Sequence, residues 1–125
     1  MGYKITKEDE KKIACLSDYQ KAILHLLAEV PKGKVTTYGD LAKELARRNP
    51  KWSPNASRAV GTTMRNNLLG PYVPCHRVIK SDGTIGNFRG GAKGAVKEKI
   101  QMLRDEGVEV INGKINLKRY RHNFT

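Results

Sequence analysis

The sequence predicts a single compact, mainly α-helical domain with a helix-turn-helix and a short C-terminal β-hairpin. A length of 125 residues is that of one domain with one modest core. Apolar residues recur at helical spacing behind polar residues of the kind that cap helices. An Asn-Gly pair at residues 112–113 lies between apolar residues that alternate, which is a strong local signal for a hairpin.

The first predicted helix begins at Ser17, because Ser17 and Gln20 have the spacing of a capping box. Pro31 and Gly33 end it. Its apolar face consists of Ala22, Ile23, Leu26, Leu27 and Val30. Residues 1–16 are treated as an N-terminal extension, and their charged first part is either a helix start or a frayed arm.

A second helix is predicted to start near Thr37 and Asp40, which have similar capping chemistry. Residues 49–54 form a loop, and Asn55 or Ser57 caps a third helix. The inner faces comprise Leu41, Ala42, Leu45 and Ala46 in the second helix and Ala59, Val60 and Met64 in the third. Two short helices joined by a loop have the outline of a helix-turn-helix.

This pair of helices is basic. Residues 43–65 contain six Lys or Arg and one Glu, a net charge of +5. Such a stretch is commonly a solvated helical face. In the alternative interpretation one helix enters a DNA groove and its cations neutralise phosphates.

The remainder is predicted from turn signals and one more helix. Residues 66–79 are mostly irregular, 81–84 form a turn and 86–94 form a glycine-rich loop. Apolar residues mark a helix that ends at Gly107, namely Val96, Ile100 and Leu103. The hairpin occupies residues 108–117. The domain thus spans residues 17–117, and residues 118–125 form a basic tail.

Composition excludes several classes of protein. The net charge of +12 fits a nucleic-acid partner, but it also fits a surface kept soluble by excess Lys. No apolar run approaches the roughly 20 residues that span a bilayer, and no secretory signal is present. The two cysteines form no disulfide framework, and the three histidines are scattered, so no metal or cofactor is expected. We therefore expect a cytoplasmic protein, or a nuclear one in a eukaryote.

Cys75 is the candidate nucleophile, and it lies in the sequence Pro74-Cys75-His76-Arg77-Val78. A thiol attacks as thiolate, and an imidazole favours that form. On an extended strand neighbouring side chains point opposite ways, so a water would carry the proton to His76 and a carboxylate would orient the ring. An isolated cysteine is more often a small buried hydrophobe, which is how we interpret Cys15.

The pentapeptide resembles the active-site motif of the O6-alkylguanine-DNA alkyltransferases, DNA repair proteins that react only once. Other segments resemble the same family in order and spacing: residues 37–42, 58–61, 64–67, 83–91 and 97–107. Together they cover about residues 17–110. The resemblance implies irreversible transfer of an alkyl group from O6-alkylguanine in duplex DNA to a monomeric protein.

The resemblance also implies the catalytic roles. Cys75 attacks the alkyl carbon, His76 acts as base through a water, and Glu106 orients His76. Tyr38 helps to rotate the nucleotide out of the duplex and protonates the departing guanine. Asn67 ties the helical hinge to the active-site backbone.

Binding roles follow from the same resemblance. Arg58 fills the space left by the flipped base, and Arg65 and Thr37 join Tyr38 in contacting DNA. The carbonyls of Cys75 and Val78 receive the guanine amino group. The remaining substrate-binding residues are Phe88, Arg89, whose amide donates toward O6, and Lys99, which the spacing favours over Lys97.

The sequence departs from the family pattern in three places, one of which is two extra residues between Gly91 and the last matched helix. Only about 16 residues precede the first matched helix, so we expect the family's usual N-terminal domain to be absent. Phe88-Arg89 replaces the usual Tyr-Ser, so a serine hydroxyl toward O6 is lost. Two alternatives remain: a non-catalytic lesion sensor, whose known examples typically have Trp in place of Cys75, and a plain helix-turn-helix DNA-binding module.

Overall fold

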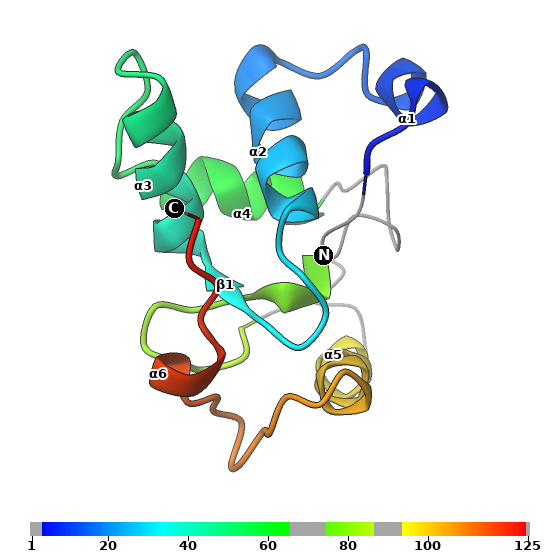
Figure 1. Cartoon of the computed structure of the whole chain (residues 1–125), viewed down its shortest axis with the longest axis vertical. Coiled ribbons are helices and arrows are strands. Elements are labelled where there is room, and N and C mark those ends of the chain that lie inside the picture. Colours follow the sequence, from blue (N-terminus) through cyan, green and yellow to red (C-terminus); the bar gives the residue numbers. More distant parts are fainter. Residues whose placement is uncertain (1–3, 66–74, 87–93, 125) are drawn as a thin grey trace.

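Helices dominate the chain in the computed structural model, which describes residues 4–65, 75–86 and 94–124. This confirms the mainly α-helical prediction. The helices are α1 (Lys7–Lys12), α2 (Asp18–Ala28), α3 (Tyr38–Arg48), α4 (Ser57–Arg65), α5 (Ala95–Asp105) and α6 (Leu117–Tyr120). The strands are β1 (Thr36–Thr37) and β2 (Val78–Ile79), and a 3-10 turn, η1 (Cys75–Arg77), leads into β2. Figure 1 shows α2, α3 and α4 at one end of the molecule and α5 and α6 at the other.

Local capping chemistry sets the start of the first helices. The backbone N–H of Gln20 donates to Ser17 Oγ at 3.2 Å, and Ser17 N–H donates to Gln20 Oε1 at 3.1 Å, which confirms the predicted capping box. A second box joins Thr6 and Asp9 and begins α1. The charged N-terminal extension is therefore partly helical. The predicted Thr37 cap of α3 is confirmed by a 3.0 Å bond from Asp40 N–H.

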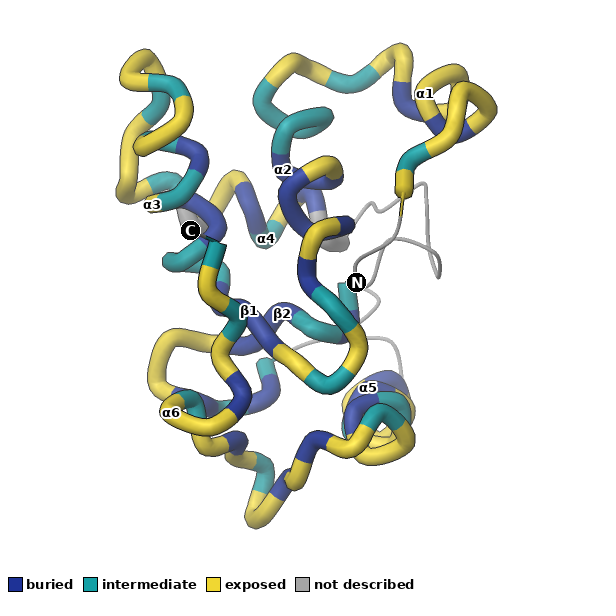
Figure 2. The backbone as a smooth tube through the Cα atoms, in the orientation of Figure 1, coloured by how far each residue is buried: buried dark blue, intermediate teal, exposed yellow. Residues whose placement is uncertain are grey.

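The first hydrophobic cluster lies where α2, α3 and α4 pack together. Fully buried side chains from all three helices fill it, including Leu24, Leu27, Leu41 and Val60, and Figure 2 shows the buried stretches facing inward. α4 begins at Ser57, and Val60 N–H donates to the carbonyl of Ala56 at 3.2 Å.

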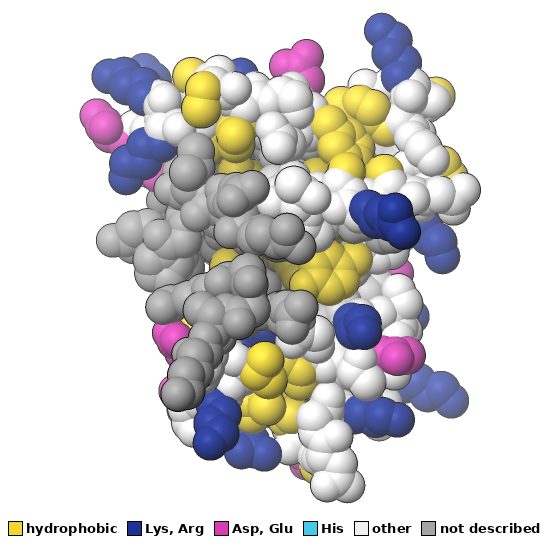
Figure 3. Space-filling view, turned by 180° about the vertical axis from the view of Figure 1, so that it is seen from behind, with side chains coloured by type: hydrophobic (Ala, Val, Ile, Leu, Met, Phe, Trp, Pro, Cys, Tyr) yellow, Lys and Arg dark blue, Asp and Glu magenta, His cyan; other side chains and the backbone are white. Residues whose placement is uncertain are grey.

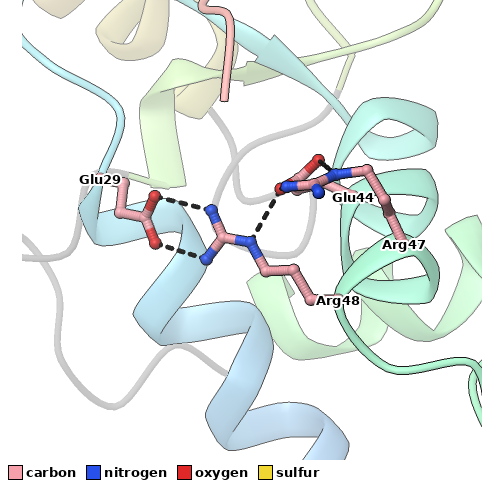
Figure 4. Close-up of polar contacts among 4 residues, drawn as sticks. All are labelled: Glu29, Glu44, Arg47 and Arg48. Atoms are coloured by element: carbon pink, nitrogen blue, oxygen red, sulfur yellow. Dashed lines mark hydrogen bonds and ion pairs between the residues drawn. The ribbon is translucent and has the colours of Figure 1, made fainter. Parts of the chain in front are cut away.

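A charged network joins α2 to α3 at the surface. The Arg48 guanidinium donates to both carboxylate oxygens of Glu29, at 2.8 and 3.0 Å, and to Glu44 at 2.8 Å. Arg47 donates to Glu44 from the other side, as Figure 4 shows. The bidentate geometry fixes how the last turn of α3 lies against the end of α2.

The two strands were not predicted. β1 and β2 are parallel and pair Thr36 with Val78 and Thr37 with Ile79. The sequence predicts mostly irregular structure for residues 66–79, and strands of two residues are too short to show an alternating pattern. The pairing connects the end of the molecule that holds α2, α3 and α4 to a second hydrophobic cluster. This second cluster includes Val35, Ile79, Leu103, Val108 and Tyr120.

The predicted Asn-Gly turn is present. Asn112 and Gly113 have φ of 52° and 71°, as a tight turn of this type requires, and Ile111 and Lys114 exchange two 3.0 Å hydrogen bonds. The residues on either side of the turn do not form strands, so the turn is closed by the pairing of Ile111 with Lys114. In the described ranges, no helix is long and apolar enough to cross a membrane.

Candidate active site around Cys75

Cys75 opens the 3-10 turn that precedes β2, and it is half-buried against the first hydrophobic cluster. This 3-10 turn replaces the extended strand that we expect from the sequence at this point. In a 3-10 turn, with three residues per turn, successive side chains diverge by about a third of a circle. Cys75 therefore remains partly exposed while His76 is 4% exposed.

Glu106 contacts His76, which lies 30 residues before it in the sequence. Its Oε2 lies 2.9 Å from His76 Nε2. Glu106 is the residue that ends α5, and Gly107 follows it with φ of 87°, a conformation that favours glycine. The end of α5 thus points the carboxylate toward η1, against which the helix packs.

Arg77 completes this cluster, and the sequence analysis gave it no role. Its guanidinium donates to Glu106 Oε1 at 2.9 Å, to Glu106 Oε2 at 2.7 Å and to the carbonyl of Val30 at 2.8 Å. The side chains of Arg77 and Glu106 are only 12% and 10% exposed. Its position beside His76 in the motif was the one available signal.

The charges in this cluster favour a neutral His76. Burial lowers the pKa of His76, and the nearby cations act in the same direction, while Glu106 opposes them. Burial alone would raise the pKa of Glu106, but hydrogen bonds and charge from Arg77 and His76 outweigh it and hold that pKa below its usual range. A neutral ring beside an ionised carboxylate holds its proton on Nε2, so Nδ1 is left as a proton acceptor.

Tyr38 is the first residue of α3 and is half-buried against the first cluster. Burial raises the pKa of its phenol, and the negative charge that Cys75 carries as thiolate raises it further. The phenol is therefore held in its protonated form, in which it can donate a proton or a hydrogen bond.

Lys99 is fully buried on the inner face of α5, whereas Lys97 is exposed. Its ammonium donates to the carbonyls of Val78 at 2.6 Å and Ile85 at 2.7 Å. Burial lowers its pKa to about 8, and the charge of Cys75 opposes that shift. The Val78 carbonyl has a second lone pair, so it can accept one further donor.

Residues predicted to contact DNA lie in different environments. Arg58 is exposed in the first turn of α4. Thr37 is 1% exposed and its hydroxyl caps α3, which differs from the surface contact expected of it. Asn67, Phe88 and Arg89 lie outside the described residues, as does the side chain of Arg65.

Lys and Arg side chains are prominent on the surface of the described residues. Seen from behind, the molecule exposes hydrophobic side chains with Lys and Arg around them (Figure 3). In the part of the chain that the structure describes, no three His, Cys, Asp or Glu side chains are grouped as a metal ion needs.

Comparisons with known proteins agree on one family. The family model described as 6-O-methylguanine DNA methyltransferase, DNA binding domain, matches residues 18–108. A bifunctional methyltransferase/endonuclease of Picrophilus torridus is 42% identical over 106 residues, which are 85% of this chain and 32% of that protein. The methylated-DNA–protein-cysteine methyltransferase of Shigella flexneri is 39% identical over 89 residues, 71% of this chain and 46% of that protein. This chain therefore spans less than half the length of these two relatives.

Other relatives match over more of their own length. The DNA base-flipping protein of Escherichia coli K12 is 35% identical over 116 residues, 92% of this chain and 82% of that protein. S. pombe Atl1, crystallised with damaged DNA containing O6-carboxymethylguanine, has a TM-score of 0.69 at 30% identity and covers 85% of this chain and 95% of its own. Mycobacterium tuberculosis OGT in complex with DNA has a TM-score of 0.62 at 30% identity. The match covers 73% of this chain and 49% of the OGT chain. The family match over residues 18–108, which include Cys75, His76 and Glu106, shows that the chain belongs to the 6-O-methylguanine DNA methyltransferase family.

Proposed function

We propose that this chain repairs DNA by moving an alkyl group from O6-alkylguanine in duplex DNA to Cys75, once per molecule. The observation that carries the proposal is a half-buried cysteine beside a buried His76 that is bonded to Glu106. This is the arrangement of a thiol nucleophile, its base and the group that orients the base. This chain spans less than half the length of the two methyltransferase relatives, so the activity of the whole protein is part of the proposal.

The chemistry balances without a cofactor. His76 Nδ1 takes the thiol proton through a water, and Cys75 Sγ forms a bond to the alkyl carbon as the carbon–O6 bond breaks. The electron pair of that bond passes to the guanine, and the Tyr38 phenol gives it a proton. The thioether product is not hydrolysed, so each molecule reacts once.

Access to O6 requires the nucleotide to leave the base stack, at a cost of a few kcal/mol. Arg58, exposed at the start of α4, fills the vacated space in this proposal. α3 and α4 act as the helix-turn-helix on a monomeric protein, with Tyr38 and Arg65 near the backbone of the DNA, while the buried Thr37 acts only as the cap of α3. Asn67, Phe88 and Arg89 keep the roles that the family resemblance implies, and Lys99 holds the Val78 carbonyl that receives the guanine amino group.

Mass spectrometry tests the transfer directly. Incubation with a duplex oligonucleotide containing O6-methylguanine is expected to replace one hydrogen by a methyl group on the peptide that contains Cys75. Cys75→Ser abolishes the change but keeps DNA binding. Cys15→Ser is the matched control, because Cys15 is the other free cysteine and is exposed; it should transfer normally.

The non-catalytic lesion sensor is the second candidate. Its support is the coverage of the E. coli base-flipping protein and of S. pombe Atl1 over most of their own lengths. Tight binding of the O6-methylguanine duplex with no mass change on Cys75 would establish it and overturn the transfer proposal.

A further inference from the structure

The C-terminal segment, residues 116–124, runs along the edge of β1 and past the start of α3 (Figure 1). Val35 N–H donates to the carbonyl of Tyr120 at 2.8 Å, and His122 N–H donates to the carbonyl of Val35 at 2.7 Å. The strand β1, which directly follows Val35, pairs with β2. The segment lies beyond the residues that the family model matches.

The side chain of Arg121 in the C-terminal segment forms an ion pair with α3. Arg121 Nε lies 2.9 Å from Asp40 Oδ2, with the two side chains 47% and 24% exposed. The oxygen itself is buried, and among the described residues no hydrogen bond of good geometry reaches it. Arg121 is thus the cation that compensates the burial of this carboxylate oxygen.

Asp40 belongs to the turn that carries Tyr38. Its backbone N–H donates to Thr37 Oγ1, and its carboxylate faces Arg121, so the first turn of α3 is held from two sides. First turns of helices lack half of the usual backbone hydrogen bonds and are prone to fray. The direction of the Tyr38 side chain follows from the backbone of this turn.

We propose that Arg121 is a positioning residue: through Asp40 it fixes the first turn of α3 and so holds the direction of the Tyr38 side chain. This inference rests on the proposed function, since it concerns the group that rotates the nucleotide and protonates the guanine. An ion pair as exposed as this one changes a conformational equilibrium by roughly two- to fivefold, and the rate of transfer should change by a similar factor.

A double-mutant cycle separates positioning from a general effect. Arg121→Ala is expected to slow transfer from the O6-methylguanine duplex by about two- to fivefold, and Arg121→Lys should recover part of the loss. In a Tyr38→Ala background Arg121→Ala should cause no further loss. Lys118→Ala is the matched control: it removes one exposed cation from the same segment and should leave the rate near that of the wild type.

The proposal would be overturned if Arg121→Ala slowed transfer by the same factor in the wild-type and Tyr38→Ala backgrounds. It would also be overturned if Lys118→Ala slowed transfer as much as Arg121→Ala does. Hydrogen exchange gives a readout that needs no chemistry: the amides of Asp40 and Leu41 should exchange about two- to fivefold faster in Arg121→Ala. Unchanged exchange overturns the inference. A wild-type protein that transfers no alkyl group, but whose Arg121→Ala variant shows this faster exchange, overturns the proposed function and supports the role of Arg121 in holding the turn.

Discussion

Replacing Arg77 by Met removes the cation from the cluster around Glu106 and keeps most of its bulk. Glu106 then loses two charge-assisted hydrogen bonds and keeps the one to His76, while the carbonyl of Val30 loses its donor. Removing one partner of a buried pair typically costs about 3–5 kcal/mol, because the other charge is left uncompensated. That is a large share of the roughly 5–15 kcal/mol that stabilises a domain.

Urea unfolding measures this loss. The single tryptophan, Trp52, packs edge-on against Tyr19 with the ring centroids 5.1 Å apart. Its fluorescence therefore reports on unfolding at the end of the molecule that holds α2, α3 and α4. We expect the free energy of unfolding of Arg77→Met to fall by about 3 kcal/mol or more at pH 7. The control Arg48→Met breaks a more exposed network and should cost about 1 kcal/mol or less.

The pH dependence gives a second check on the same variant. The pKa of Glu106 is lowered in the folded protein, so its contribution to stability is present above the ordinary value of about 4.3 and is lost as pH falls through the folded value. The stability difference between wild type and Arg77→Met should therefore shrink as the pH falls below about 4. A loss under about 1 kcal/mol at pH 7, or a difference that does not change with pH, would refute the reasoning.

Three further outcomes are expected. The ring of His76 should titrate below the usual value of about 6.5 in an NMR experiment, and its pKa should fall further in Glu106→Gln because the carboxylate supports the charged ring; a rise would contradict this. Burial lowers the pKa of Lys99 to about 8, so between about pH 8 and pH 10 the unfolded chain holds more protons than the folded one. The stability of the wild type relative to Lys99→Met should therefore rise with pH across that range, and a constant difference would argue against it. Ser17→Ala should lower the free energy of unfolding by about 1 kcal/mol in urea titrations, and no change would show that the capping box is dispensable.

Local features of the fold could be predicted and non-local ones could not. The capping bonds at Ser17 and Thr37 span three residues, so the sequence shows both partners together. β1 and β2 have two residues each and pair across the chain, which no periodicity indicates.

Helix α5 illustrates how little the apolar pattern says about which side chains are buried. Of the apolar residues that predict this helix, Val96 is 41% exposed and Leu103 is buried, and Ala95 and Lys99 are buried beside it. A lysine at a core position is normally assigned to the surface. Two backbone carbonyls satisfy its ammonium, and the folded chain alone brings them within reach.

The family resemblance supplied what local rules could not at the site. It named Cys75, His76 and Glu106 together, and the 2.9 Å contact between His76 and Glu106 fits that grouping. It gave no reason to expect Arg77 to bond to both Glu106 and Val30, because that pair of contacts depends on where the turn after α2 lies relative to the end of α5.

Long-range hydrogen bonds around Cys75 and the C-terminal segment also predict the order in which parts of the protein fold. Arg77 bonds to Val30 across 47 residues, and Lys34 bonds to Arg119 across 85. Loop-closure entropy delays such contacts, so we expect α2, α3 and α4 to collapse first and the site to close afterwards. Substitutions at Arg77 or Glu106 should then speed unfolding and leave the folding rate nearly unchanged. The part of the chain that brings Cys75, His76 and Glu106 together would accordingly be the first to open.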